Sequence, residues 1–414
     1  MKDTTHSLLR ATLFGGMVII GVAGVQAQDW PQWRGANRDG IAKGFNAPKA
    51  WPAQLTQKWK ETVGSGDATP ALVGDKLYVF SRVGTEENLI CMSAADGKEI
   101  WRKKYEAPQP NGPAAREHSG PRSSPTVASG KVVTFGVTGI LTCWDAADGK
   151  QLWQKTDVRS WPRFYTSASP LIEDGLCVAQ LGGQADGGIT AYDLKTGAEK
   201  WLWKGGGPGY ASPVLMTVAG TKIVVALTDK SLVGILLADG KLAWETPFAA
   251  QGMNYNAATP IVDCDTLIYA GAGRGIHAVK VAKQGEAFST TELWTAPEIS
   301  PQFSSAVLKD GFLYGITQRG FLFCVNAKTG AVAWTDADAK GPQGYGSVVD
   351  AGSVLLALTP KMQLYVVQPT DKAYTQLASI KVADSATFAY PVVSGSRLFI
   401  RDKDSIALLT VEGQ

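Results

Sequence analysis

The sequence has few of the side chains from which most metal and acid–base centres are built. It contains three histidines in 414 residues, whereas zinc centres draw most of their ligands from histidine and cysteine. The five cysteines stand far apart, with no C-x-x-C motif, no haem-attachment motif and no adjacent pair: Cys91, Cys143, Cys177, Cys264 and Cys324. A histidine-based metal centre is therefore not expected, and no metal ligand is assigned.

Charge of either sign is also scarce. Charged residues make up 19% of the chain, and 40 Lys and Arg against 37 Asp and Glu leave a net charge of +3. Nucleic-acid binding relies on a strong positive field, so no nucleic-acid partner is expected. The chain has no phosphate-binding loop and no G-x-S-x-G nucleophile motif. No catalytic residue is assigned.

Long hydrophobic runs are absent beyond the N-terminus. Lys2 and Arg10 precede an apolar stretch from Ala11 to Val25, which ends in Val25-Gln26-Ala27. This pattern predicts a signal peptide over residues 1–27, cleaved after Ala27. An uncleaved membrane anchor is the alternative, but the stretch is short for a bilayer. We expect a periplasmic or secreted protein whose mature form does not span the membrane and, lacking a cysteine at the cleavage site, carries no lipid anchor.

What the chain does contain is a repeat. A Ser/Thr-Pro pair opens a hydrophobic run at Thr69-Pro70, Ser124-Pro125, Ser169-Pro170, Ser212-Pro213 and Thr259-Pro260, and weaker versions follow at Ser304-Ser305, Gly346-Ser347 and Tyr390-Pro391. The spacing is about 46 residues, which is the period of a four-stranded propeller blade. Gly-containing turns such as Asp96-Gly97 and Thr196-Gly197 separate short alternating strands. Eight such units predict one domain.

Tryptophan marks the last strand of most units. The clearest copy runs from Ala191 to Trp201 and fits A-x-D-x-x-T-G-x-x-x-W. It resembles the tryptophan-docking motif of the pyrroloquinoline quinone (PQQ)-like repeat propellers, and the resemblance covers residues 57–414. Large rings on the outer strands can wedge between blades. We expect this docking role for Trp59, Trp101, Trp153, Trp201, Trp244, Trp294 and Trp334.

The last unit ends without a fourth strand or a tryptophan, whereas Trp59 precedes the first unit. We therefore expect an all-β protein: an eight-bladed β-propeller of four-stranded antiparallel blades, with its ring closed by an N-terminal strand. The predicted division is a signal peptide (1–27), an N-terminal strap (28–56) and the propeller (57–414). The strap contains the segment from Asp29 to Gly40, which resembles a leader of exported propellers of the same class. We expect it to pack on the ring, and a direct role in ligand binding is the alternative.

Functional residues are expected where the loops vary. The segments leading into the first strand of each unit, and the turns between second and third strands, share one face of a propeller. Their aromatic, polar and basic residues would form a funnel over the central channel: Arg82, His118, Arg122, Arg163, Tyr165, Tyr210, Asn254, Tyr255, Arg274, Phe303, Arg319, Tyr345 and Arg401. The alternative interpretation is structural, with rings that wedge blades apart and basic groups that are solvated.

The resemblance implies two classes of function. BamB-like members of the group are non-catalytic scaffolds, and others are PQQ-dependent dehydrogenases of alcohols or sugars that hold Ca²⁺. The side-chain types needed for quinone chemistry occur singly, and no motif joins them: Asp67, Glu117, Asn254, Arg274 and Trp161. The first hypothesis is a monomeric, cofactor-free scaffold that binds a protein or small-molecule partner on the funnel face. A PQQ-dependent dehydrogenase and a glycan-binding propeller are the alternatives.

Overall fold

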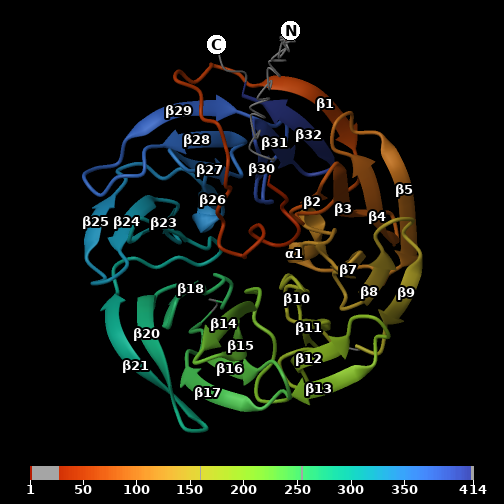
Figure 1. The fold of residues 1–414 in the computed structure, drawn as a ribbon, viewed down its shortest axis with the longest axis vertical. Coiled ribbons are helices and arrows are strands. Elements are labelled where there is room, and N and C mark those ends of the chain that lie inside the picture. The colour runs from red at the N-terminus through yellow and green to blue at the C-terminus, as the bar shows by residue number, and fades with distance from the viewer. Residues whose placement is uncertain (2–27, 159, 253–254, 412–414) are drawn as a thin grey trace.

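The protein is a closed ring of eight four-stranded antiparallel blades (Figure 1). The structure is a computed structural model that describes residues 1, 28–158, 160–252 and 255–411. The predicted eight-bladed all-β propeller is confirmed, while the predicted signal peptide and its cleavage site lie outside the described residues, apart from Met1. In the described part, helices are too short to carry the chain across a bilayer.

The blades follow one another in chain order, and each runs from an inner strand at the channel to an outer strand at the rim. Blades 1 and 2 comprise β2 (Ala71–Val73), β3 (Lys76–Val83), β4 (Glu86–Ser93), β5 (Glu99–Glu106), β6 (Thr126–Ala128), β7 (Lys131–Phe135), β8 (Leu141–Asp145) and β9 (Gln151–Lys155). Blades 3 and 4 comprise β10 (Leu171–Glu173), β11 (Leu176–Leu181), β12 (Gly188–Asp193), β13 (Glu199–Trp203), β14 (Val214–Val218), β15 (Thr221–Leu227), β16 (Ser231–Leu236) and β17 (Leu242–Pro247). Blades 5 and 6 comprise β18 (Ile261–Asp263), β19 (Thr266–Gly271), β20 (Gly275–Gln284), β21 (Ala287–Ala296), β22 (Val307–Lys309), β23 (Phe312–Ile316), β24 (Leu322–Asn326) and β25 (Val332–Thr335). Blade 7 comprises β26 (Ser347–Asp350), β27 (Leu355–Thr359), β28 (Gln363–Val367) and β29 (Gln376–Lys381).

Blade 8 is made from both ends of the chain. Its inner strands are β30 (Val392–Ser394), β31 (Arg397–Arg401) and β32 (Ser405–Thr410), and its outer strand is β1 (Thr56–Thr62). β1 pairs antiparallel with β32 and places Trp59 opposite Leu408. The predicted closure by an N-terminal strand is therefore confirmed, and it leaves no blade with only three strands in the described ring.

The tight turns at the rim follow from their Asp and Gly residues. In blade 3, the Asp193 carboxylate accepts hydrogen bonds from the backbone N–H of Thr196 (2.9 Å) and from its hydroxyl (3.0 Å). Gly197 then takes a φ of +72°, which an L side chain rarely adopts. The turn reverses the chain so that β13 runs back alongside β12.

The outer-strand tryptophans pack on these turns in the next blade. The indole N–H of Trp153 donates to the Leu194 carbonyl (3.0 Å), and a Cβ on Gly197 would lie 2.7 Å from its ring. Trp59 meets Gly97 in the same way, and Trp201 meets Gly240. Six of the seven predicted tryptophans are buried and Trp101 is half-buried. The glycine of the turn motif therefore leaves room for the neighbouring blade's indole.

The hydrophobic core lies between the blades as well as within them. One buried cluster joins blades 7, 8 and 1 with the strap residues Trp30 and Phe45, and others join blades 2 with 3, 3 with 4, 4 with 5 and 5 with 6. Cys91, Cys143 and Cys324 are fully buried in this core, as expected for small apolar side chains at one repeated position. Cys264 is exposed.

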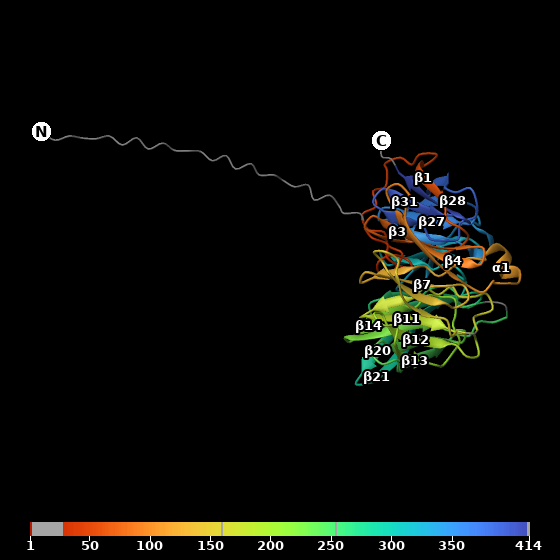
Figure 2. The same cartoon turned by 90° about the vertical axis from the view of Figure 1, so that its right-hand side faces the viewer.

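The two faces of the ring carry different segments. Figure 2 shows the N-terminal strap on one side and the short helix α1 (Pro113–Glu117) on the other. The side chain of Asp29, at the start of the strap, accepts a hydrogen bond from Gly74 N (2.8 Å) in the β2–β3 turn. α1 belongs to the long segment that leads into blade 2. The strap therefore lies on the face of the short Gly turns, opposite the face predicted to be the funnel.

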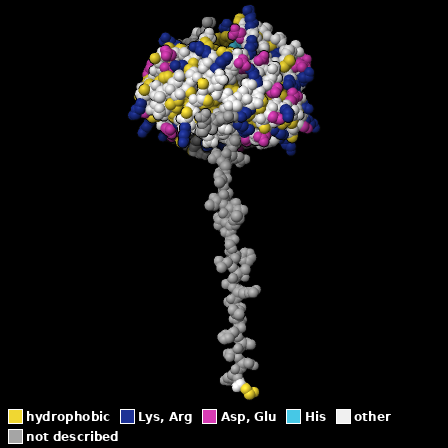
Figure 3. All heavy atoms as spheres, turned by 90° about the horizontal axis from the view of Figure 1, so that it is seen from above, with side chains coloured by type: hydrophobic (Ala, Val, Ile, Leu, Met, Phe, Trp, Pro, Cys, Tyr) yellow, Lys and Arg dark blue, Asp and Glu magenta, His cyan; other side chains and the backbone are white. Residues whose placement is uncertain are grey.

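The rim seen in Figure 3 mixes positive, negative and hydrophobic side chains. This distribution matches the net charge of +3 over the whole chain. Since neither sign dominates that side of the molecule, charge alone gives it no preference for a strongly acidic or basic partner.

Candidate functional site

The segments that lead into the inner strands are tied together around the channel. Hydroxyls of the repeated Ser or Thr accept hydrogen bonds from the backbone of the preceding blade, and we call this set of bonds the hydroxyl relay. Ser124 N donates to Ser169 Oγ (2.9 Å), and Ser169 N donates to Ser212 Oγ (2.9 Å). Tyr390 N donates to Thr69 Oγ1 (2.9 Å) and so links blade 8 to blade 1. These bonds explain why the sequence repeats a small hydroxyl residue at this position.

The repeat is offset by one residue in blade 6. Thr259 N donates to Ser305 Oγ (2.8 Å), although the sequence alignment pairs Thr259 with Ser304. Ser304 Oγ is buried and has no hydrogen-bond partner in the described part. The hydroxyl relay therefore uses the second serine of this pair.

Just before these hydroxyls, the same segments carry half-buried rings that converge over the channel. We call them the funnel ring: His118, Phe164, Tyr210, Tyr255, Phe303, Tyr345 and Phe388. On one side, the rings of Phe164 and Tyr255 meet edge-on at 4.8 Å between centroids, and Tyr210 meets Tyr255 at 5.5 Å. Blades 3, 4 and 5 thus share one aromatic surface.

The other side of the funnel ring is equally continuous. Phe303 stacks on Tyr345 with centroids 4.2 Å apart and planes 3° from parallel. Tyr345 meets Phe388 edge-on at 5.5 Å, and Phe388 meets His118 at 4.6 Å. Edge-on and offset contacts are the favoured arrangements of aromatic rings. The surface is consequently held by ring–ring contacts that cross blade boundaries.

A polar group closes the ring between blades 1 and 3. The His118 Nδ1 atom lies 2.7 Å from the Asp67 carboxylate. Arg122 donates to the carbonyl oxygens of Phe164 and His118, the latter at 2.9 Å. Burial lowers the pKa of Arg122, while the nearby charge of Asp67 raises it. Arg122 thus holds the lead-in segments of blades 2 and 3 together beneath the rings.

Tyr165 supports this group from below. Its hydroxyl donates to the Asn111 carbonyl (2.7 Å) and accepts from the Asn111 N–H (2.6 Å), just before α1. The Arg122 guanidinium lies 5.8 Å from its ring centre. Tyr165 is buried, at 5% exposure, and has a φ of +68°. It therefore fixes the long insertion and offers little surface to a ligand.

A pocket of about 420 Å³ opens beside the funnel ring, between blades 3 and 5. Tyr210 and Tyr255 form one wall, and Arg163, Asp229 and Lys230 add charges. One carboxylate oxygen of Asp229 is buried with no hydrogen-bond partner in the described part, and burial raises its pKa. This pocket combines charges of both signs with aromatic walls, and aromatic residues are enriched in protein interfaces.

Four of the predicted residues belong neither to the funnel ring nor to the polar groups and the pocket that adjoin it. Arg82 is 2% exposed and donates to the Ala107 carbonyl (2.9 Å), and Arg401 is 1% exposed and donates to the Gly66 carbonyl (2.7 Å). Arg274 donates to Asn256 Oδ1 (2.7 Å) and covers the Phe248 ring at 3.9 Å. Arg319 is exposed beside Phe321. Asn254 lies outside the described residues.

The predicted funnel residues omit four that the structure brings to the site: Asp67, Phe164, Asp229 and Phe388. Phe388 and Asp67 stand two residues before Tyr390 and Thr69, as Tyr210 stands two residues before Ser212. That shared offset is a signal from which these two residues could have been predicted. Asp229 carries no such signal, because it lies in a turn between second and third strands whose length varies.

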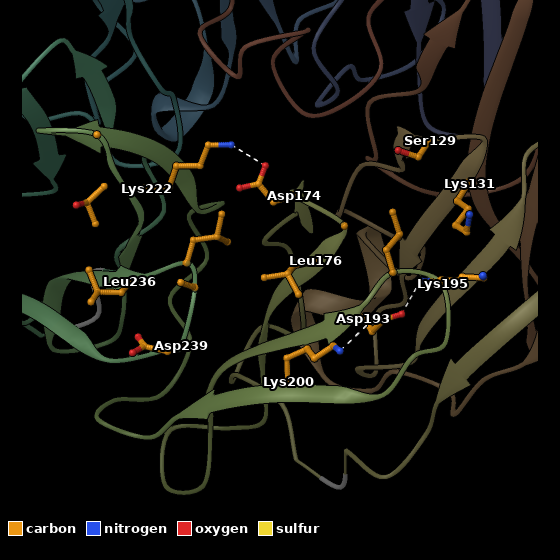
Figure 4. Close-up of a pocket in the computed structure, with 16 residues that line it drawn as sticks. Ser129, Lys131, Asp174, Leu176, Asp193, Lys195, Lys200, Lys222, Leu236 and Asp239 are labelled. Atoms are coloured by element: carbon orange, nitrogen blue, oxygen red, sulfur yellow. Dashed lines mark hydrogen bonds and ion pairs between the residues drawn. The ribbon is translucent and has the colours of Figure 1, made fainter.

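A larger depression of about 980 Å³ lies on the opposite face, between the turns of blades 2, 3 and 4 (Figure 4). Its charged side chains largely pair with one another: Lys222 lies 2.7 Å from Asp174, and Lys200 lies 3.3 Å from Asp193. The depression is broad and open. It lacks the convergent rings of the funnel face, so we place the candidate site on the funnel face.

The closed ring, the indole-on-glycine contacts and the hydroxyl relay together define a propeller of the PQQ-like repeat class. Residues 85–336 match the family model described as outer membrane protein assembly factor BamB. This match covers more than half of the chain, and the chain belongs to that family.

Individual relatives agree with this assignment. The BamB of Burkholderia pseudomallei is 25% identical over 363 residues, which cover 84% of this chain and 86% of that protein. The structure of BamB from Moraxella catarrhalis superposes with a TM-score of 0.65 at 16% identity, covering 87% of this chain and 99% of that chain. A europium-containing methanol dehydrogenase gives a TM-score of 0.70 at 14% identity, covering 90% and 89%. At such identities the two structures show the shared fold alone.

Proposed function

We propose that this protein is a non-catalytic scaffold that binds a protein partner through the funnel ring and the adjoining pocket. The observation that carries the proposal is the convergence of rings from most lead-in segments on one face, with a charged pocket beside them. Aromatic residues are enriched where proteins bind each other. The relatives are named as factors in outer membrane protein assembly. We therefore propose that the partner is a protein of that process, and that this protein binds it after export.

The quinone alternative asks for a different set of residues. It needs a cation held by carboxylate and amide oxygens, with an arginine and a stacking ring at the cofactor. In the described part no three His, Cys, Asp or Glu side chains group as metal ligands do. Asp67 contacts His118, Glu117 is exposed on α1, and Arg274 is bound to Asn256. These residues do not fit the cofactor, and we assign no step to it.

The first prediction concerns the funnel ring. We expect a photo-crosslinking amino acid at Phe388, in the chain expressed and exported in its own host, to capture one outer membrane assembly protein. The double variant Tyr210→Ala, Tyr255→Ala should lose most of that product, because it removes both rings that wall the pocket. Truncation of such anchors typically costs about 2 kcal/mol or more, a factor of about 30 in affinity. Mass spectrometry identifies the product.

The matched control places the crosslinker at Ser129, which is exposed on the opposite face. It should give no product with the same protein. Equal capture from both faces, or none from Phe388, would contradict the proposal. Titrating the purified protein with PQQ plus Ca²⁺, and with a panel of polysaccharides, while following tryptophan fluorescence tests the two alternatives: saturable quenching by either ligand would favour it.

A further inference from the structure

Within residues 30–42, the strap contacts all eight blades, either on the inner strand or on the residues just before it. Five backbone hydrogen bonds join it to blades 1, 2 and 7. Trp30 N donates to the Leu72 carbonyl of blade 1 (2.8 Å), and Val127 N of blade 2 donates to the Pro31 carbonyl (2.8 Å). In blade 7, Asp350 N donates to the Gly40 carbonyl (2.9 Å). The segment therefore pairs through its backbone with the inner strands of blades 1, 2 and 7.

Two arginines of the strap supply three further blades. Arg38 donates to the Pro213 carbonyl of blade 4 (2.9 Å) and to the Ser169 carbonyl of blade 3 (3.3 Å). Arg34 donates to the Ala306 carbonyl of blade 6. Arg38 is 3% exposed and Arg34 is 0% exposed. Buried guanidinium groups need acceptors, because an unpaired buried charge is costly. The carbonyls at the starts of the inner strands accept from both groups, although Nε and Nη1 of Arg34 have no hydrogen-bond partner in the described part.

Trp33 contacts the two remaining blades, 5 and 8. Its indole N–H donates to Thr259 Oγ1 of blade 5 (3.1 Å), and its ring meets Tyr390 of blade 8 edge-on at 4.8 Å. The acceptors on the ring belong to the inner strands and the hydroxyl relay, which the blades form among themselves. The channel thus presents an arrangement of acceptors that a segment with Trp and Arg at these spacings can occupy.

The same lead-in segments carry the funnel ring. Tyr210 stands three residues before Pro213, Tyr255 four residues before Thr259, and Phe388 two residues before Tyr390. Each short stretch is held at one end by the strap and presents an aromatic ring at the other. The strap and the funnel ring therefore share the same short segments.

We propose that the central channel is a peptide-binding site whose ligand is this chain's own strap, an extended segment with paired tryptophans and arginines. We further propose that its occupancy fixes the lead-in segments that present the funnel ring. The first statement is independent of the proposed function, and only the second rests on it.

The test keeps the full chain during folding. A protease site introduced at Ala53–Gln54, where both residues are exposed, allows the folded protein to be cut between strap and β1. We expect the released N-terminal fragment to co-elute with the ring in gel filtration and to exchange with a labelled peptide of residues 28–42. The pair Arg34→Gln, Arg38→Gln should weaken retention at least about tenfold. A cut fragment that leaves the unaltered ring immediately would overturn the first statement.

Arg102→Gln is the matched control, because Arg102 is a partly exposed arginine that pairs with Glu99 on the outer strand β5. It should retain the fragment as the unaltered chain does. If the arginine pair does not fold, exchange of the labelled peptide into the cut unaltered protein still decides between a binding site and a covalently held strap.

Hydrogen exchange tests the second statement without any partner. After the strap has been displaced, amides in residues 163–170 and 208–213 should exchange at least about tenfold faster, while those of the outer strand β13 stay unchanged. Equal exchange before and after displacement would overturn it. Neither outcome bears on whether the funnel ring binds a protein, so the two proposals fail separately.

Discussion

At the scale of single residues, the contacts between blades depend on glycines, whose lack of a Cβ leaves room for a neighbouring indole. Gly197 lacks the Cβ that would meet the Trp153 ring, and the same holds for Gly97 against Trp59 and Gly240 against Trp201. The sequence motif predicts this pairing because it sets a glycine and a tryptophan at a fixed distance. The positions of Arg82 and Arg401 could not be predicted in the same way, since both reach backbone carbonyls that other loops place beside them.

A matched pair of glycines in blade 3 tests this packing. Gly197 and Gly175 have nearly equal φ values of +72° and +74°, but no heavy atom lies within 4 Å of a Cβ built on Gly175. Gly197→Ala should destabilise the protein by about 1–3 kcal/mol more than Gly175→Ala, because the added methyl group overpacks the indole. Denaturant unfolding measures the difference. Equal losses would show that strain at positive φ is the whole effect.

At the scale of elements, the ring depends on one strand from the far end of the chain. β1 completes blade 8 against β32, and Trp59 then packs on the β4–β5 turn of blade 1. The sequence predicts this element because the last unit lacks a tryptophan and an unpaired one stands before the first unit. It could not predict the course of the strap, because the partners of the strap are distant in sequence: Arg34 and Ala306 alone are 272 residues apart.

Removing this closure should have a large cost. We expect deletion of Lys58 to Val63 to abolish soluble expression or to lower the melting temperature sharply, and Trp59→Ala alone to cost about 3–5 kcal/mol. Leu377→Ala, at an exposed position of the outer strand β29 in the neighbouring blade, is the control and should cost little. Calorimetry measures both. A deletion variant with an unchanged melting curve would contradict the role of β1.

At the scale of the whole molecule, the core buries several weakly acidic side chains, namely cysteine thiols and tyrosine hydroxyls. Burial raises the pKa of the Cys91 and Cys324 thiols to about 11 and of the Tyr192 and Tyr269 hydroxyls to about 12. Each group is held neutral in the folded ring and ionises more readily once the chain unfolds.

The eight-bladed fold itself is predictable, because each blade repeats the same local pattern. The funnel ring is only partly predictable, because its offsets from the repeat vary from one to six residues.

The raised pKa values of the buried thiols and tyrosine hydroxyls predict that the folded protein is sensitive to alkaline pH. A group whose pKa is raised on folding contributes stability that is full below its unfolded value, 9.0 for the Cys91 thiol, and is lost as the pH rises through its folded value, about 11. Stability should therefore fall steadily above pH 9. The pair Cys91→Ala, Cys324→Ala should lessen the fall measured by thermal melting, whereas Cys264→Ser, at an exposed position, should leave it unchanged. A flat profile up to pH 11 would contradict this view of the core.

The placement of the strap also decides how the protein can be handled. The chain leaves the ring at Asp29 on the face opposite α1, beside the β2–β3 turn (Figure 2). A bead, sensor chip or fusion partner attached just before Gln28 would be joined to the face opposite the funnel ring. The funnel ring would then stay accessible to solvent. A reporter joined there would likewise lie on the face opposite a partner bound at the funnel ring.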